Sequence, residues 1–274
     1  MSDYLSLPIK EINELLKNKK ILPIDLVNEF VEKVSNDQFN TFITLDIEGA
    51  IKQAHELENK EVDNLLFAIP LVINDNIVTK GIKTSCGSLM LDNFYPIYDA
   101  SVVERVKEKN MIIVGKANMS EFDISLDEGY YGLVKNKIND EHIGGSGGSV
   151  VSVSVGYTPI SLATSINENL SLASSLSQVV SLKPTYGLVS RYGLISPTSS
   201  FEQIAPISKN IIDNAILFDA IIGFDEKDYM TVKDYKFNIN NLKTKLKNKR
   251  VAIPNYYLND NLAEGENNLF KNII

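Results

Sequence analysis

Hydrophobic residues recur at helical spacing in three stretches near the start of the chain. In residues 8–19, 23–34 and 46–59, apolar side chains three and four positions apart fall on one face, and polar side chains occupy the other. A stripe of this kind is normally buried against the rest of a protein. The pattern therefore predicts that residues 1–60 form an N-terminal helical segment.

After residue 60 the pattern changes to short apolar runs that alternate with amphipathic stretches. Residues 65–73 are almost continuously apolar, which is typical of a strand in a sheet covered on both faces. The next helix is expected at residues 101–109. Further strands are expected at residues 111–115, 160–163 and 179–182, and further helices at residues 170–177 and 210–222. This alternation predicts an α/β domain over residues 61–274.

Residues 144–187 combine many glycines and serines with apolar residues. A flexible linker can have such Gly and Ser content, but a linker has no use for side chains such as Val150, Val151, Leu162 and Val180. The second interpretation is a backbone kept bare so that its N–H groups can approach an oxyanion beside a serine hydroxyl. The apolar residues favour this second interpretation.

Composition and charge indicate a folded protein without a broad basic surface. The chain has 274 residues, of which 44% are hydrophobic, and its net charge is −8. These values argue against disorder and against direct binding of nucleic acid. No run approaches the roughly 20 apolar residues of a membrane span. We therefore expect a cytoplasmic protein that makes no membrane contact.

Cysteine and histidine are too few for a disulfide or a metal site. The single cysteine, Cys86, is expected to be a small buried apolar residue rather than a nucleophile. The two histidines, His55 and His142, stand apart from each other, and His55 lies off the apolar face of its helix, which favours a solvated side chain. We expect no metal and no cofactor in this chain.

Several short sequence words resemble those of the amidase signature family. They are Asp-Asn-Ile at residues 75–77, Gly-Lys-Ala-Asn-Met at 115–119, Lys-Pro-Thr-Tyr-Gly at 183–187 and Val-Ser-Arg-Tyr-Gly-Leu at 189–194, in the family's order. Within the family, the words are similar to those of the A subunits of glutamyl-tRNA(Gln) amidotransferase. The resemblance implies a mixed sheet core flanked by helices, and glutamine amide hydrolysis as the ancestral activity.

The resemblance also places the family's catalytic triad on three positions of this chain. Members use a lysine base, a second serine and a serine nucleophile. Here Asn74 occupies the lysine position, Ser146 retains the second serine, and Asn169 occupies the nucleophile position when residues are counted back from Lys183 without a gap. An amide side chain has no hydroxyl for attack and cannot exchange a proton near neutral pH. Loss of such a unit costs about a million-fold in rate.

The family's oxyanion hole falls on Ile166, Asn167 and Glu168. A carboxylate at Glu168 would repel the negative charge that develops on the attacked carbonyl. We therefore predict a pseudoenzyme whose hydrolytic centre is dismantled, with only Ser146 keeping the family's residue type at a triad position. Two alternatives remain open. Ser171 or Ser174 could act as a displaced nucleophile in a working amidase or glutaminase, or the chain could be a remnant without a function.

The resemblance further implies partners. We predict a non-hydrolytic assembly subunit that binds B- and C-type amidotransferase subunits in a complex that converts Glu-tRNA(Gln) to Gln-tRNA(Gln). ATP and magnesium would belong to the B-type subunit, which would also carry the tRNA, so this chain would contact tRNA only indirectly. Family members continue well past residue 274, so the fold is expected to be truncated before its C-terminal part. Unpaired strand edges would then favour a partner.

Overall fold

The computed structural model describes residues 3–124, 129–138, 142–143, 146–166, 169–198, 200–243, 250, 252, 265 and 268. The chain divides into two compact units, Met1–Ile239 and Asn240–Ile274. All described helices and strands lie in the first unit, except that the helical turn η4 (Ile239–Lys243) continues into the second. The predicted boundary near residue 60 stays a prediction. Residues on both sides of it belong to the first unit.

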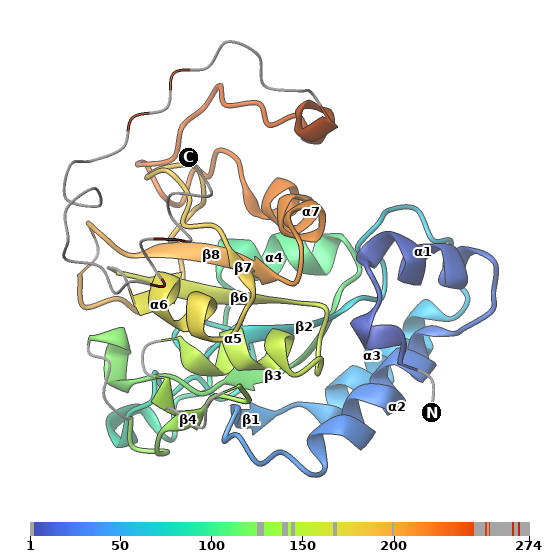
Figure 1. Cartoon of the computed structure of the whole chain (residues 1–274), viewed down its shortest axis with the longest axis horizontal. Helices are drawn as coiled ribbons and strands as arrows, with labels where there is room; N and C mark the ends of the chain where they lie inside the picture. Colours follow the sequence, from blue (N-terminus) through green and yellow to red (C-terminus); the bar gives the residue numbers. More distant parts are fainter. Residues whose placement is uncertain are drawn as a thin grey trace. The chain divides into compact units, whose positions relative to one another are not determined.

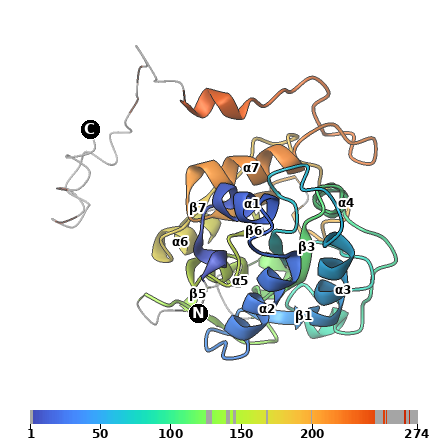
Figure 2. The same ribbon diagram turned by 90° about the vertical axis from the view of Figure 1, so that its right-hand side faces the viewer.

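The first unit alternates helices with short strands (Figure 1, and turned by 90° in Figure 2). Its helices are η1 (Tyr4–Ser6), α1 (Ile9–Lys17), α2 (Pro23–Val34), α3 (Ile47–Leu57), η2 (Leu89–Leu91), α4 (Ser101–Glu108), η3 (Glu121–Asp123), α5 (Gly147–Ser154), α6 (Asn169–Leu176) and α7 (Ile211–Ile221). Its strands are β1 (Phe42–Leu45), β2 (Pro70–Asn74), β3 (Ile112–Ala117), β4 (Val134–Lys135), β5 (His142–Ile143), β6 (Ile160–Ser165), β7 (Val180–Ser181) and β8 (Gln203–Ser208).

Six of these strands form a mixed sheet, as the predicted fold class requires. The strand order is β1-β3-β2-β6-β8-β7. β3, β2 and β6 are parallel, whereas β1, β8 and β7 pair antiparallel with their neighbours. In this register Asn74 lies opposite Ala117 of β3, and Ile73 lies opposite Leu162 of β6. Residues 74–76 therefore follow the carboxyl end of a central parallel strand, where functional side chains usually lie in such sheets.

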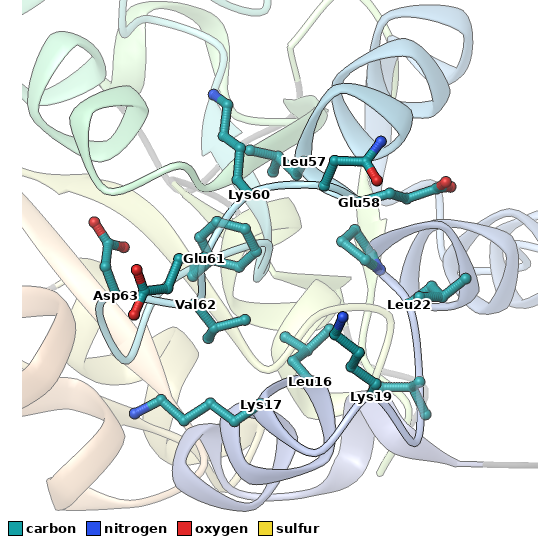
Figure 3. A pocket seen from close by; sticks show the side chains of 14 residues that line it. Leu16, Lys17, Lys19, Leu22, Leu57, Glu58, Lys60, Glu61, Val62 and Asp63 are labelled. Carbon is teal, nitrogen blue, oxygen red and sulfur yellow. The ribbon is translucent and has the colours of Figure 1, made fainter.

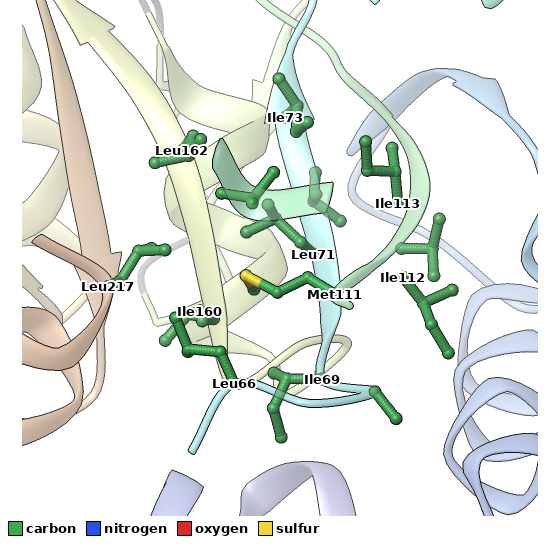
Figure 4. Close-up of a cluster of buried hydrophobic side chains, with 14 of the residues drawn as sticks. Leu66, Ile69, Leu71, Ile73, Met111, Ile112, Ile113, Ile160, Leu162 and Leu217 are labelled. Carbon is green, nitrogen blue, oxygen red and sulfur yellow. The ribbon is translucent and has the colours of Figure 1, made fainter. Parts of the chain in front are cut away.

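Apolar side chains cover both faces of the sheet. Val150 and Val151 of α5 pack in one cluster with Ala163 of β6 and Ala205 of β8. A larger cluster joins β2, β3 and β6 to the N-terminal helices, α4 and α7 (Figure 4). Its labelled members include Leu71, Ile73, Ile113, Leu162 and Leu217. Complete burial of each such side chain stabilises the fold by about 1.5–3 kcal/mol.

The predicted helices are confirmed, but one predicted strand is shorter than expected, and the strands β1 and β8 were not predicted. The strand predicted at residues 65–73 begins only at Pro70, because residues 65–68 form a turn in which Ala68 has a φ of 60°. The four-residue strand β1 lies inside the segment predicted to be helical. It pairs with β3 at the edge of the sheet. Its partly exposed residues lack the continuous apolar character of β2.

The Gly/Ser-rich stretch is not a linker. Its described residues form α5, β6, α6 and β7. Gly148 in the first turn of α5 is needed for close packing, because a Cβ atom there would lie 2.4 Å from the carbonyl oxygen of Thr41 and 2.5 Å from that of Asn118. The Gly148 N–H donates to the Asn118 carbonyl at 2.9 Å. This N–H is therefore engaged by the fold and is not free for an oxyanion.

Candidate functional site

Asn74, Asp75 and Asn76 at the end of β2 are all completely buried. The Nδ2 atom of Asn74 lies 2.9 Å from Thr164 Oγ1, 3.1 Å from Ser146 Oγ and 3.1 Å from Asn76 Oδ1. An amide nitrogen has two N–H bonds, so it can satisfy only two of these oxygen acceptors at once, whereas an ammonium group has three. The surroundings of Asn74 thus match the donor count of a lysine better than that of an asparagine.

Ser146 precedes α5, but its hydroxyl does not cap the helix. It donates instead to the Thr164 carbonyl at 2.8 Å, and it accepts from the Thr164 N–H at 3.1 Å. Ser149, one turn further along α5, donates to Asn74 Oδ1 at 3.2 Å or to the Leu162 carbonyl at 3.0 Å. Both serines therefore fasten α5 to β2 and β6. The structure brings Asn74 and Ser146 together, as the triad positions predict.

Two buried carboxyl groups border this hydrogen-bond network, and sequence reasoning did not single them out. Thr164 Oγ1 lies 2.9 Å from Asp123 Oδ2, and Asn76 Nδ2 donates to Glu202 Oε1 at 2.8 Å. The other carboxyl oxygens, Asp123 Oδ1 and Glu202 Oε2, have no hydrogen-bond partner within the described part of the chain. The only signal in the sequence is that each acid stands beside an apolar stretch, which many solvated acids share.

The electrostatics of the network follow from burial. Burial raises the pKa of Asp123 to about 8, and the nearby charge of Glu202 raises it further in the same direction. Burial also raises the pKa of Glu202 to about 7, although hydrogen bonds from Ser196, Thr164 and Asn76 oppose the shift. Both groups therefore hold protons near neutral pH that an exposed carboxyl would release.

A buried amine lies close by, but it faces another set of atoms. Lys116 of β3 donates to the Ile77 carbonyl, and its Nζ lies 3.4 Å from Thr79 Oγ1 and 3.3 Å from Thr84 Oγ1. Burial lowers the pKa of Lys116 to about 8, while the charge of Asp75 opposes that shift. Lys116, Thr79 and Thr84 are all completely buried. The amine therefore holds the loop after β2 in place and offers no accessible base.

The predictions for Cys86 and His55 are confirmed. Cys86 is completely buried, and burial raises the pKa of its thiol, so it is not a nucleophile. The side chain of His55 is exposed, and its Nδ1 lies 2.8 Å from Glu58 Oε1. Within the described ranges, no group of three or more His, Cys, Asp or Glu side chains could hold a metal ion.

The other triad and oxyanion positions lie around α6. Asn169 is the first residue of that helix and is buried. The Ile166 carbonyl accepts from the exposed Lys183 ammonium at 2.8 Å, while Asn167 and Glu168 lie outside the described residues. Of the displaced serine candidates, Ser171 is exposed, and the buried Ser174 hydroxyl has no hydrogen-bond partner in the described part of the chain.

A hollow of about 930 Å³ is lined by residues that come before Asn74 in the sequence (Figure 3). It lies between the end of α1, the start of α2 and the segment after α3. Charges of both signs line it, since Lys17, Lys19 and Lys60 alternate with Glu58 and Glu61. It contains no member of the Asn74 network, and its mixed rim gives no preference for one ligand charge.

Comparison with known proteins identifies the scaffold that carries this network. The Amidase family model matches residues 25–274. The chain belongs to the amidase signature family. The A subunit of glutamyl-tRNA(Gln) amidotransferase from Pediococcus pentosaceus is 36% identical over 271 residues, which are 95% of this chain and 56% of that protein. The protein of the same name from Staphylococcus epidermidis is 37% identical over 268 residues, which are 93% of this chain and 55% of that protein.

Solved amidase-family structures share the fold. The A subunit of glutamyl-tRNA(Gln) amidotransferase from Thermotoga maritima matches with a TM-score of 0.74 and 34% identity, over 86% of this chain and 51% of that one. The native peptide amidase from Stenotrophomonas maltophilia matches with a TM-score of 0.80 and 25% identity, over 86% of this chain and 52% of that one. The chain thus spans about half the length of its amidase-family relatives. No helix within the described ranges has the length and apolar character to cross a membrane.

Proposed function

We propose that this chain is a non-hydrolytic counterpart of the amidotransferase A subunits and that it scaffolds a tRNA-dependent amidotransferase. It would bind B- and C-type subunits in the cytoplasm, while ATP, magnesium and the tRNA would be handled by the B-type subunit. Ammonia from solution would supply the nitrogen that converts Glu-tRNA(Gln) to Gln-tRNA(Gln). The names of its amidase-family relatives support the choice of complex.

The relationship between Asn74 and Ser146 carries the proposal. A serine is activated by a neighbouring base that can accept its proton. Ser146 Oγ instead accepts a hydrogen bond from the Nδ2 of Asn74 and donates its own hydrogen bond to the Thr164 carbonyl. No lysine, arginine or histidine nitrogen bonds this hydroxyl within the described residues. The Ser146 hydroxyl therefore serves as a structural hydrogen-bonding group, and no basic side chain among the described residues bonds it.

The positions of the two displaced serines also support a non-hydrolytic role. Ser171 lies on the exposed side of α6, and Ser174 is buried on the same helix. Neither hydroxyl has a hydrogen bond to a lysine or histidine in the described part of the chain. The carboxyl groups of Asp123 and Glu202 bond Thr164 and Asn76 rather than either serine.

Exposed apolar side chains support a role in assembly. The segment of residues 89–98, which contains η2, presents Leu89, Met90, Tyr95 and Ile97 with exposed fractions of 56%, 84%, 59% and 86%. So many large apolar groups in ten residues are typical of a surface that a partner covers. We assign this segment to contact with one of the two partner subunits.

Co-purification tests the proposal directly. The chain would be expressed with B- and C-type subunits from the same genome, and the complex would be isolated through a tag on the B-type subunit. We expect this chain to elute in a stoichiometric complex that forms Gln-tRNA(Gln) from Glu-tRNA(Gln), ATP and ammonium but not from glutamine. The double variant Met90→Ser/Ile97→Ser should elute alone, whereas Tyr229→Ser, which changes an equally exposed aromatic residue, should remain bound. Failure of the unmodified chain to bind either subunit would contradict a scaffold role.

A further inference from the structure

The turn η3 lies at the surface, but it directs one ionisable side chain into the protein. Glu121 and Ile124 are exposed, whereas Asp123 between them is only 1% exposed. The Asp123 Oδ2 atom lies 2.9 Å from Thr164 Oγ1 of β6, and its Oδ1 atom has no hydrogen-bond partner among the described residues. The carboxyl group is therefore buried at a place from which a small movement of the backbone would bring it into water.

The backbone of this turn is strained. Phe122 has a φ of 52° and Asp123 a φ of 58°, and residues other than glycine rarely adopt such values. Cys86, which contacts the turn, is strained as well, with a φ of 56°. Conformations of this kind persist only where the surrounding contacts hold them. Loss of those contacts would allow the turn to relax.

The turn is tied to the segment that contains η2. The Phe122 N–H donates to the Cys86 carbonyl at 2.8 Å, and Ser88 Oγ donates to Glu121 Oε1 at 2.5 Å. The same Ser88 Oγ accepts from the Met90 N–H at 3.2 Å and caps η2. A change in η3 would therefore reach η2 and its exposed apolar side chains directly.

The charges around Asp123 favour opening of the turn once this group ionises. Burial raises the pKa of Asp123 to about 8, the charge of Glu202 before β8 raises it in the same direction, and the charge of Lys183 after β7 opposes the shift. Glu121 on the turn itself is a further acid, and it is exposed. The Cys86 thiol stays neutral, because burial raises its pKa. An ionised Asp123 would thus be a buried charge beside a second buried acid, which is costly.

We propose that η3 is a pH-dependent switch: when Asp123 ionises, the turn opens, places the carboxylate in water and releases the segment that begins η2. Opening separates Asp123 from Glu202 and relieves the positive φ values of Phe122 and Asp123. In the open turn Asp123 is solvated and ionises as an ordinary aspartate does. Opening therefore becomes about tenfold more favourable for each pH unit between about pH 4 and pH 8, and no more favourable above that range.

Hydrogen–deuterium exchange of the whole chain tests the switch. Exchange would be measured at about pH 5.5 and about pH 7.5, with each rate corrected for the intrinsic exchange rate at that pH. We expect the protection of the amides of residues 122–124 to fall by about tenfold or more between these pH values, whereas the amides of β6 should keep theirs. Asp123→Asn, which cannot ionise, should abolish the fall. Asp219→Asn, at an exposed acid of α7, should leave it unchanged.

Three results would overturn the switch. They are equal protection at both pH values, a fall that Asp123→Asn retains, and a parallel fall in β6, which would indicate global unfolding. Glu202→Gln is a second variant, which removes the like charge and should make the fall smaller. If Asp123→Asn does not fold, as judged by circular dichroism, an unchanged fall in Glu202→Gln overturns the switch instead.

A consequence for assembly rests on the proposed function. Residues 89–98 are assigned there to a partner subunit, so opening of η3 should weaken the complex several-fold over the same pH range, and Asp123→Asn should remove this dependence. The exchange measurement needs no partner. Failure of the unmodified chain to bind a subunit at either pH would therefore contradict the scaffold role without altering the result for the switch.

Discussion

The Nδ2 atom of Asn74 lies 3.1 Å from the Oγ atom of Ser146, with the amide as donor and the hydroxyl as acceptor. This relationship reverses the polarity that hydrolysis needs, because a general base accepts the proton of the serine it activates. The same contact is favourable for stability, since it satisfies buried polar atoms of β2 and α5. The network thus keeps an amidase-family core packed around a serine hydroxyl that bonds no basic side chain among the described residues.

Substitutions of Asn74 should show, through the free energy of unfolding, that the surrounding oxygen atoms need a hydrogen-bond donor at this position. Asn74→Leu removes the donor and leaves buried oxygens unsatisfied, so we expect the free energy of unfolding to fall by about 2–4 kcal/mol. Asn74→Lys supplies three donors to the three oxygens and should be tolerated better. Urea unfolding measures both, with Asn59→Leu at an exposed position as the control. Equal losses for the leucine and lysine variants would refute the donor-count argument.

Stability should decline as the pH rises through neutrality. The pKa of Asp123 rises from 3.8 to about 8 on folding, and that of Glu202 from 4.5 to about 7. Because the folded state holds protons that the unfolded chain releases, this contribution is complete below about pH 4 and is lost as the pH approaches 8. Lys183 is the positive group whose charge lowers both values.

The amide variant Asp123→Asn/Glu202→Gln isolates this effect. Unfolding by urea at pH 5 and pH 8 should show the unmodified chain losing about 2 kcal/mol or more relative to the double variant, because each shifted group contributes up to about 1.4 kcal/mol per pH unit. The double variant keeps acceptors for Thr164 and Asn76. Parallel pH profiles for the two proteins would show that the carboxyls titrate normally.

Gly148→Ala should destabilise the fold through a steric clash. The added Cβ would lie 2.4 Å from the Thr41 carbonyl oxygen, and a backbone atom cannot move aside as a side chain can. We expect a loss of about 2–3 kcal/mol. Gly81→Ala is the matched control, since it has a φ of 77° but open space around it, and should lose about 1 kcal/mol from backbone strain alone. Thermal unfolding of both proteins provides the comparison.

The effects of substituting Lys116 and Asp75 on the free energy of unfolding should be coupled. Burial raises the pKa of Asp75, and the positive charge of Lys116 opposes that shift. Lys116→Met removes this charge from beside a buried carboxyl, so we expect a loss of about 3–5 kcal/mol in the free energy of unfolding. In an Asp75→Asn background the same substitution should cost at least about 1 kcal/mol less. A double-mutant cycle by urea unfolding measures this coupling. Additive losses would show that Lys116 acts only through the carbonyl and hydroxyls around it.

The sequence predicted the parallel strands β2, β3 and β6 well because their burial leaves a continuous apolar run, whereas β8 was not predicted. Residues 74–76 were expected at the end of such a strand, and the structure has them there. The edge strand β1 was missed because an edge position requires no such run. The turn before Pro70 was missed because its residues are apolar as well. Their burial in the core outweighs the usual polarity of turns.

The sequence predicted only those residues of the candidate site that lie within recognisable family motifs. The family words indicated Asn74 and Ser146, and the structure brings them together. Thr164 of β6, Asp123 of η3 and Glu202 just before β8 lie beside them because the fold brings distant parts of the chain together. No local sequence pattern indicates these contacts. Nothing in the neighbouring residues of Asp123 separates it from a solvated acid.

Ammonia release from glutamine is the most direct test of the central claim. The chain, assembled with the proposed B- and C-type subunits, would be incubated with glutamine, and ammonia would be measured by a coupled glutamate dehydrogenase assay against the same complex carrying Ser146→Ala. The account predicts no release above the glutamine-only background, and no difference between the two complexes. Glutamine-dependent release that Ser146→Ala abolishes would contradict it.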